Sequence, residues 1–268
     1  MKRTSSRFFS AAAVTGAVAM AAATAGNAVD SEVPSYQEFK AQTFKDVDGQ
    51  YVVNGDEVVG KERGLRSYYE EMTAAPSTDG LIINRVYGGD DKWSSSQVAN
   101  LTYCVSTKFG SNYTAVRNVM AAGGNQWEAA SSRVNFVHVS SQDSSCSTRN
   151  RNVVFSIEPT TTTQYIARAF FPSTAKSGRN VLVNARSLLN SGSWSPSNIM
   201  AHELGHVLGF RHEHTRPEAG TCFEDNSWRP LTPYDSASIM HYPQCNGSSS
   251  NLSMTSADRS GVRSVYGS

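Results

Sequence analysis

The sequence predicts an α+β fold, and three features of its pattern indicate this class. Short segments rich in β-branched and aromatic residues lie between turn-forming residues in the middle of the chain. Two longer stretches carry apolar residues at helical spacing, and the stretch after residue 209 is rich in Pro, Gly, Asp and Ser and is expected to be irregular. Hydrophobic residues make up 39% of the 268 residues, which allows a buried core and excludes a disordered, collagen-like or coiled-coil protein.

The individual elements follow from these patterns. Residues 113–131 are expected to form an amphipathic helix because apolar residues recur near a period of 3.6. Ser195 followed by Pro196 is typical of a helix start, and this second helix should run to about Gly209. A closing helix is expected over residues 256–266. The expected strands are residues 101–106, 133–139, 152–157, 166–171 and 180–184.

The charge of the chain gives little indication of a partner. It has 24 Lys and Arg residues against 23 Asp and Glu residues, a formal net charge of +1. This balance indicates neither a basic surface for nucleic acid nor one for an anionic membrane. We therefore expect no nucleic-acid partner, no membrane partner and a monomeric protein.

The first residues have the pattern of an export signal. Lys2, Arg3 and Arg7 precede a mostly apolar run over residues 8–23, and small residues follow in an A-x-A-like pattern. A transmembrane anchor is the alternative, but the run is short, rich in Ala and interrupted by Thr and Gly, whereas spanning needs about 20 apolar residues. We expect residues 1–25 to be a signal peptide and the mature protein to be secreted and extracellular.

The next segment, residues 26–79, has the features of a propeptide. Acidic residues outnumber basic ones here, whereas basic residues are in excess in the rest of the chain, so the two parts could attract each other. Asn54-Gly55 between two Val-rich runs predicts a β-hairpin, and residues 61–72 have helical spacing. A linker follows. The main domain is then expected over residues 80–268.

One short motif in this segment begins like a calcium-binding loop. Asp46, Asp48 and Gly49 fit the start of such a loop, but Tyr51 stands at the sixth position, where the loop needs glycine. A simple turn is therefore the expected structure.

The four cysteines, Cys104, Cys146, Cys222 and Cys245, are expected to form disulfides because an exported protein folds in an oxidising environment. Four cysteines allow three pairings, and we favour Cys104 with Cys146 and Cys222 with Cys245. These pairs fall on opposite sides of the histidine motif described next, and each closes a loop of moderate length. A zinc site of cysteines is the alternative, but the chain has no C-x-x-C spacing.

The strongest signal in the chain is the pattern H-E-x-x-H-x-x-G-x-x-H, which begins at His202 and ends at His212. His202 and His206 are separated by about 400° around a helix, so both imidazoles project from one face toward a common metal. His212 cannot join them on a continuous helix, because it would lie about 15 Å further along the axis. The chain must turn sharply, and Gly209 can end the helix since it can adopt a positive φ.

Three imidazoles at this spacing predict a site for one catalytic zinc ion with an open position for water. Zinc lowers the pKa of bound water toward about 7. Glu203 follows the first histidine directly and is placed to accept a proton from that water and to pass it to a leaving amine. The alternatives are ordinary surface histidines and a solvated helix carboxylate.

These residues resemble the motif of the metzincin zinc endopeptidases, and most closely that of the astacin family. Ser238-Ile239-Met240-His241-Tyr242 is similar to the methionine-containing turn of that clan in its astacin form, S-x-M-H-Y. The resemblance implies that Met240 forms an apolar floor below the histidines. It also implies that Tyr242 is a further, movable zinc ligand with a part in catalysis. A core methionine and a core tyrosine are the alternatives.

The resemblance covers about residues 195–242 well and the rest only in outline. Glu213 follows the third histidine as in astacins, where the family pattern ties it to the new N-terminus after activation, and an exposed carboxylate is the alternative. The cysteine positions differ from those of animal astacins, and residues 256–267 look instead like a matrixin C-terminal helix. The implied α+β fold is metzincin-like, with a twisted mixed β-sheet, an active-site helix, a cleft and a small irregular C-terminal subdomain.

A short motif in the expected propeptide also resembles one found in astacins. Astacins block their zinc with an aspartate in an F-x-G-D element, and Val53-Asn54-Gly55-Asp56 is similar to it except for Val in place of Phe. Asp56 is therefore a candidate zinc switch. The alternative is that Asn54-Gly55 is only a hairpin turn with Asp56 at its flank. Matrixins are kept inactive by a cysteine of the propeptide. This segment has no such residue, because the first cysteine of the chain is Cys104.

The sequence thus predicts a secreted zinc-dependent metalloendopeptidase that is made as a latent proenzyme and hydrolyses peptide bonds in protein or peptide substrates. Residues 80–268 are its expected catalytic domain. Metzincin substrates bind extended beside an edge strand, for which residues 166–171 are our candidate and an internal strand is the alternative. A catalytically inactive, zinc-stabilised binding or adhesion protein of the same fold is the alternative function, although the intact Glu203 argues against it.

Overall fold

The structure is a computed structural model that describes residues 35–72 and 81–268. The predicted signal peptide and the predicted linker lie outside these residues. From residue 35 the chain forms a three-stranded antiparallel sheet with two helices. The elements are α1 (Tyr36–Gln42), β1 (Phe44–Lys45), β2 (Tyr51–Val53), β3 (Glu57–Val59) and α2 (Lys61–Met72).

The hairpin and the helix predicted in this segment are both present. β2 and β3 pair antiparallel, and the turn between them has positive φ angles of 55° at Asn54 and 96° at Gly55. The helix predicted over residues 61–72 is α2. The expected turn at Asp46 is closed by a hydrogen bond from the amide of Gly49 to the Asp46 carbonyl, 2.9 Å. Helix α1 and strand β1 are additional elements that the pattern did not indicate.

The main sheet has five strands in the order β7-β6-β8-β10-β9. The first four run parallel, and β9 at the edge is antiparallel to β10. The sheet is therefore mixed, as expected, and the candidate edge segment lies at its edge. The strands are β6 (Leu101–Val105), β7 (Phe136–His138), β8 (Phe155–Pro159), β9 (Ala167–Arg168) and β10 (Asn180–Val183).

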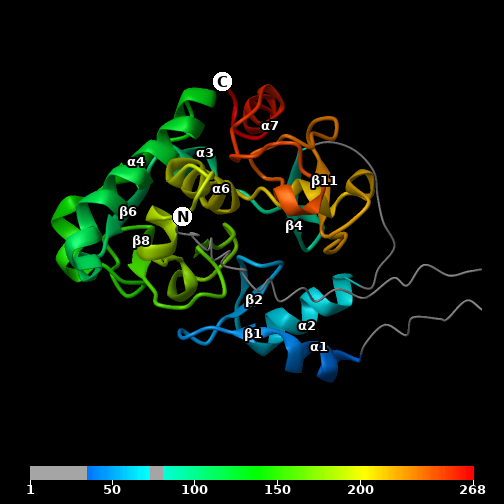
Figure 1. Cartoon of the computed structure of the whole chain (residues 1–268), viewed down its shortest axis with the longest axis horizontal. Helices are drawn as coiled ribbons and strands as arrows, with labels where there is room; N and C mark the ends of the chain where they lie inside the picture. The colour runs from blue at the N-terminus through cyan, green and yellow to red at the C-terminus, as the bar shows by residue number, and fades with distance from the viewer. Residues whose placement is uncertain (1–34, 73–80) are drawn as a thin grey trace, which may run out of the picture. The chain divides into compact units, whose positions relative to one another are not determined.

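Helices α4 (Tyr113–Ala130) and α6 (Pro196–Val207) confirm the two predicted helices and lie side by side (Figure 1). Gly123 allows their close contact, because a Cβ at this position would lie 2.9 Å from the Ala201 nitrogen. The indole of Trp127 donates to the Ala201 carbonyl at 2.7 Å. The main apolar core includes residues of both helices and of the sheet. Packing in this core therefore fixes the position of α6 without the help of a ligand.

The part of the chain after Gly209 is more ordered than expected. β11 (Trp228–Pro230) pairs antiparallel with β4 (Ile82–Val86), which also pairs with β5 (Gly89–Asp90). The prediction of an irregular segment was wrong for β11, because a strand of three residues that ends in Pro has no recognisable periodicity. The remaining helices are α3 (Ser95–Val98), α5 (Ala185–Leu189) and the predicted closing helix α7 (Ser256–Tyr266), with short 3-10 turns η1 to η6 between elements.

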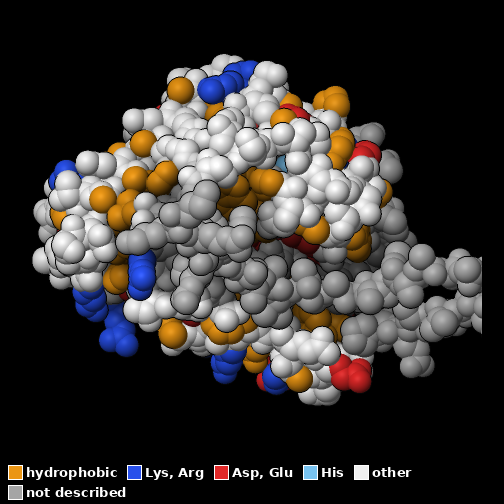
Figure 2. Space-filling model, in the orientation of Figure 1, with side chains coloured by type: hydrophobic (Ala, Val, Ile, Leu, Met, Phe, Trp, Pro, Cys, Tyr) orange, Lys and Arg blue, Asp and Glu red, His pale blue; other side chains and the backbone are white. Residues whose placement is uncertain are grey.

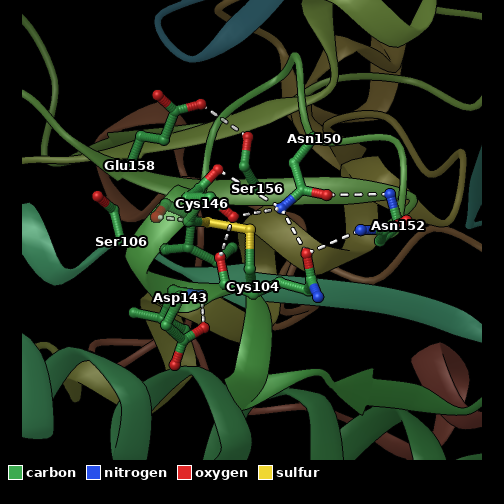
Figure 3. Close-up of a disulfide and its surroundings, with 12 residues drawn as sticks. Cys104, Ser106, Asp143, Cys146, Asn150, Asn152, Ser156 and Glu158 are labelled. Carbon is green, nitrogen blue, oxygen red and sulfur yellow. Dashed lines mark hydrogen bonds between the residues drawn. A yellow bond between two sulfur atoms is a disulfide. The ribbon is translucent and has the colours of Figure 1, made fainter.

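Both favoured disulfides are present. Cys104 bonds to Cys146, and Cys222 bonds to Cys245. The first joins β6 to the segment after β7, below the loop that carries Asn150 and Asn152 (Figure 3). The second lies in the part of the chain that follows α6, and the described residues contain no free cysteine.

The surface of the described residues agrees with the balanced composition. Figure 2 shows Lys and Arg side chains at separate places on one face, with no continuous basic area among the coloured residues. Within residues 35–72 and 81–268, none of the helices has both the length and the apolar character that a bilayer span requires.

Candidate metal centre

Helix α6 presents His202 and His206 on one face, as their spacing predicts. Their ring centroids are 5.0 Å apart, and both side chains are buried. The C-terminal end of the helix is held by side chains from elsewhere in the fold. The indole of Trp93 donates to the Val207 carbonyl at 2.7 Å, and the hydroxyl of Tyr266 donates to the Leu208 carbonyl at 2.6 Å. These bonds satisfy carbonyls that a helix end leaves unpaired.

The predicted sharp turn occurs at Gly209, where φ is +99°. Beyond it the chain runs beside β4, because the amide of Arg211 donates to the Ile82 carbonyl at 3.0 Å and the Gly209 carbonyl accepts from the Asn84 amide at 2.8 Å. This path returns His212 to the other two histidines, and its Nε2 lies 3.1 Å from the Nε2 of His202. The backbone therefore brings all three imidazoles to one point.

A hydrogen bond fixes the orientation of each imidazole through its Nδ1 atom. The Nδ1 of His202 lies 2.6 Å from the carbonyl of Ile239, and that of His206 lies 2.8 Å from the carbonyl of Phe210. The Nδ1 of His212 lies 2.7 Å from the carboxylate of Glu224. Because these acceptors favour a proton on Nδ1, each ring in its neutral form has its lone pair on Nε2, and the three Nε2 atoms face each other, as metal binding requires.

The hairpin of β2 and β3 supplies a fourth donor. The Asp56 carboxylate is buried, and its oxygens lie 3.3 Å from the Nε2 of His202, 3.5 Å from that of His206 and 3.1 Å from that of His212. Tyr242 donates its hydroxyl proton to the same carboxylate. The side chain of Asp56 thus reaches the centre of the histidine cluster from a distant part of the sequence.

These four donors fit a zinc ion. Donors about 2.0 to 2.2 Å from a tetrahedral ion lie roughly 3.3 to 3.6 Å from one another, close to the separations of 3.1 to 3.3 Å among His202, His212 and Asp56. The Nε2 of His206 and one Asp56 oxygen are buried without a hydrogen-bond partner. Buried polar atoms rarely lack a partner, and a cation between them would satisfy both.

The electrostatics of the cluster also favour a cation. Burial lowers the pKa of His202 and His206, which favours the neutral imidazoles that bind metals. Burial acts in the same direction on His212, but the carboxylates of Glu224 and Asp56 raise its pKa well above the usual value. The site therefore attracts positive charge at the Nε2 of His212, and a divalent ion supplies that charge.

Glu203 lies beside this cluster and is also buried. One of its carboxylate oxygens, Oε2, has no hydrogen-bond partner. Burial and then the negative charge of Asp56 raise the pKa of Glu203 well above its usual value, although the charges of His212 and Arg168 oppose this. A raised pKa makes this carboxylate a stronger base than one exposed to water.

The methionine-containing turn lies directly against α6. A Cβ at Gly205 would lie 2.3 Å from the sulfur of Met240, so this position has room only for glycine. The turn is fixed by Asp258 at the start of α7, which accepts from the Ser238 hydroxyl at 2.5 Å and from the Ile239 amide at 2.9 Å. Since the Ile239 carbonyl is the partner of a histidine, α7 orients that imidazole indirectly.

Tyr242 follows the same turn and lies against the imidazoles. Its ring is stacked on that of His202 with centroids 5.3 Å apart, and on that of His214 with centroids 4.9 Å apart. The hydroxyl contacts Asp56. This arrangement places the Tyr242 oxygen at the edge of the donor cluster.

Two residues important for the geometry were not identified from the sequence. Glu224 accepts from the imidazoles of His212 and His214 and from Arg211, and Asp258 supports the methionine turn. Neither residue belongs to a motif: Glu224 lies between the histidine motif and the methionine-containing turn, and Asp258 lies in the first turn of α7.

Glu213 is buried rather than exposed. It accepts from the guanidinium of Arg216 and from the amide of Asp235, each at 3.0 Å. Burial raises its pKa to about 8, although the charge of Arg216 opposes this.

The fold and the histidine site resemble those of metzincin zinc peptidases, and comparison with known proteins supports the resemblance. The family model for matrixins, peptidase family M10, matches residues 92–219, which include α6 and the three histidines. High choriolytic enzyme 2 of the medaka fish Oryzias latipes is 38% identical over 71 residues, which are 20% of this chain and 25% of that enzyme. Zinc metalloproteinase nas-30 of Caenorhabditis elegans is 41% identical over 63 residues, which are 16% of this chain and 8% of that protein.

A solved structure of high choriolytic enzyme 1, a hatching enzyme zinc-protease from the same fish, aligns over 69% of this chain and 98% of its own, with 18% identity and a TM-score of 0.45. The matching segment spans about a quarter of the length of the choriolytic enzymes. The matrixin family model and the curated zinc metalloproteinases support the resemblance to metzincin zinc endopeptidases, and the residues that the family model matches include the histidine motif.

The turn at Gly209 can be tested by Gly209→Ala. A Cβ there would lie 2.1 Å from the Asp91 carbonyl oxygen, in addition to the cost of a positive φ. We expect the free energy of unfolding of the full chain to fall by about 3 kcal/mol or more in chemical denaturation. Gly220→Ala is the control, because Gly220 has φ +70° but no atom within 4 Å of the added Cβ, and it should cost only about 1 to 2 kcal/mol. Equal losses in the two variants would contradict this account of the turn.

The orienting role of Glu224 can be tested by Glu224→Gln, which keeps the shape of the side chain but removes its charge. We expect the zinc affinity of the full chain to fall about 10-fold to 100-fold, as for other groups that orient a ligand, in competition with a chromophoric chelator. Glu218→Gln is the control, because Glu218 is exposed and, among the side chains of the described residues, its carboxylate bonds to that of Arg216 rather than to an imidazole. An unchanged zinc affinity in Glu224→Gln would exclude the orienting role.

Proposed function

We propose that this protein is a secreted zinc-dependent endopeptidase that hydrolyses peptide bonds in protein or peptide substrates and is made as a latent proenzyme. The observation that carries the proposal is the convergence of three Nε2 atoms, from His202, His206 and His212, on one buried point. The zinc peptidases to which the chain is similar support the same chemistry.

The ligands of the zinc ion would be His202, His206 and His212, with Asp56 as a fourth in the proenzyme. When bound, zinc polarises the scissile carbonyl and lowers the pKa of a water molecule. The Nδ1 hydrogen bonds hold the three rings, so little reorganisation is needed when the fourth donor is exchanged. Met240 would close the apolar floor of the site against Gly205.

Glu203 would act as the general base. Its buried carboxylate accepts the proton of the attacking water and delivers it to the nitrogen of the leaving amine. Departure of Asp56 removes one of the charges that raise the Glu203 pKa, so Glu203 is a stronger acid in the open site than in the latent one. The hydroxyl of Tyr242, released from Asp56 at the same time, would donate a hydrogen bond to the oxyanion that forms on the substrate carbonyl.

Latency would follow from the way the propeptide lies on the catalytic domain. We assign residues 1–25 to a signal peptide, 26–79 to the propeptide and 80–268 to the catalytic domain. The Asp56 carbonyl accepts from the amide of Ala169, 3.1 Å, and Glu57 forms a β-bridge with Ala169. The propeptide thereby adds to the sheet at β9, where an extended substrate would bind. The propeptide would therefore occupy both the fourth ligand position of the metal site and the edge of the sheet at which a peptide binds.

Glu203→Gln tests the catalytic step. The variant retains the shape of the side chain but cannot accept a proton, so we expect casein hydrolysis by the processed protein to fall about 100-fold to 10,000-fold. Bound zinc should be retained, and a chelator should abolish hydrolysis by the unmodified protein. If the zinc-loaded, processed protein cleaves no peptide in a diverse library, the alternative of a binding or adhesion protein is correct instead.

Asp56→Ala tests the zinc switch. Loss of a charged contact of about 1.5 to 3 kcal/mol should open the site roughly 10-fold to 100-fold more often, so the uncleaved chain should hydrolyse casein prematurely. Glu38→Ala is the control, since Glu38 is an exposed carboxylate of the same segment that bonds only to Ser35. Latency that is unchanged in Asp56→Ala would refute the switch.

A further inference from the structure

A second contact between the propeptide and the catalytic domain lies on the edge strand β9. The guanidinium of Arg168 binds two carboxylates of the propeptide turn, with Nε 2.6 Å from Asp46 and Nη2 2.6 Å from Asp48. The side chain of Arg168 is fully buried in this arrangement. The zinc ligands are not involved, so this is a separate site.

The catalytic domain surrounds these carboxylates with hydrogen-bond donors. The hydroxyl of Tyr165 donates to Asp46 at 2.6 Å, and the side-chain amide of Asn180 donates to Asp48 at 3.1 Å. Both residues are buried. With the two guanidinium nitrogens of Arg168, they give the catalytic domain four donors to the two carboxylates, which also accept from Val47 and Gln50 of their own turn.

The guanidinium is held in place by the catalytic domain itself. Its third nitrogen, Nη1, donates to the side-chain oxygen of Asn180 at 3.1 Å. Arg168 pairs with Leu182 across β9 and β10, so Arg168 and Asn180 lie on the same face of the sheet. The orientation of the Arg168 guanidinium group toward a carboxylate therefore does not depend on the propeptide alone.

Removal of the propeptide leaves this charge without a partner. Among the described residues, Asp46 and Asp48 supply every carboxylate that forms an ion pair with Arg168. An arginine that is buried beside a peptide-binding edge and has lost its counter-ions favours a new anionic partner. Ala169, the next residue, is the one whose amide binds the propeptide backbone.

We propose that Arg168, Tyr165 and Asn180 form a carboxylate-binding subsite that selects substrates with an acidic side chain near the cleaved bond. A peptide that replaces the propeptide on β9 has one residue opposite Arg168, with its side chain on the same face of the sheet. In the proenzyme Asp46 and Asp48 fill this subsite. The proposal rests on the proposed proteolytic function, since it concerns the substrate of that site.

Peptide binding to a non-hydrolysing protein tests the subsite. The full chain carrying Glu203→Gln is folded whole, cleaved at a protease site introduced within residues 73–80 and freed of its propeptide. Octapeptide pairs that differ only by Asp or Asn at one position are then titrated by fluorescence anisotropy. We expect Asp to bind about tenfold more tightly than Asn at one position, as one charge-assisted hydrogen-bond pair allows, with the preference weakened at high salt.

Variants of the same protein identify the residue responsible. Adding Arg168→Gln should abolish the preference for Asp, and Arg168→Lys should retain part of it because the charge remains without the planar fork. Arg186→Gln is the matched control, because it removes a positive charge from an exposed residue of α5 and should leave the preference unchanged.

Two results would overturn the proposal. One is that no position distinguishes Asp from Asn by more than twofold in the Glu203→Gln protein, a measurement that does not depend on the Arg168 variants folding. The other is a preference that survives in Arg168→Gln. Failure of the proposed function is distinguished by the parent protein with Glu203 intact, which would then cleave none of the peptides whatever their binding preference.

Discussion

The site depends on one constraint of the backbone, the turn at Gly209 that ends α6 and directs the chain back along β4. Without it the third imidazole would lie about 15 Å along the helix axis from His202 and about 9 Å from His206. The turn needs a positive φ and a close approach to the carbonyl of Asp91, and glycine satisfies both. Bonds from Trp93 and Tyr266 to the last carbonyls of α6 hold the helix at the point where it must stop.

The site also depends on three hydrogen-bond acceptors that face the Nδ1 atoms of the histidines. Two are backbone carbonyls, and the third is the Glu224 carboxylate. The carbonyl of Ile239 belongs to the methionine turn, which is fixed by Asp258 of the C-terminal helix. The closing helix therefore contributes to the metal centre although it contains none of the donors. The charge of Glu224 adds to that of Asp56, so the cluster attracts a cation from two sides.

The segment that we propose as the propeptide contacts the rest of the chain through three kinds of interaction. Asp56 enters the donor cluster, its backbone pairs with Ala169, and the preceding turn binds Arg168 through Asp46 and Asp48. Three of the acidic residues that give this segment its negative charge thus make specific contacts. Asp46 and Asp48, which begin like a calcium loop in sequence, bind a guanidinium instead of a metal ion.

Much of the metal centre could be predicted because it depends on the spacing and type of residues within short stretches of sequence. Spacing determines that His202 and His206 share a face, glycine at position 209 indicates the turn, and Asn54-Gly55 indicates the hairpin that carries Asp56. The disulfide pairing could also be predicted, since it follows chain order around the motif. Glu224, Asp258 and Arg168 could not be assigned roles, because their partners are distant in sequence and each is an ordinary charged residue until the fold brings those partners together. Strand β11 was missed because three residues show no periodicity.

The central claim is that the Nε2 atoms of three histidines bind one zinc ion with Asp56 as the fourth donor in the proenzyme. X-ray absorption spectroscopy at the zinc edge of the zinc-loaded full chain tests it most directly. The account predicts three imidazole nitrogens and one oxygen at about 2.0 to 2.2 Å, with the oxygen replaced or lost in Asp56→Ala. A spectrum with sulfur ligands, or with fewer than three imidazoles while zinc remains bound, would contradict it.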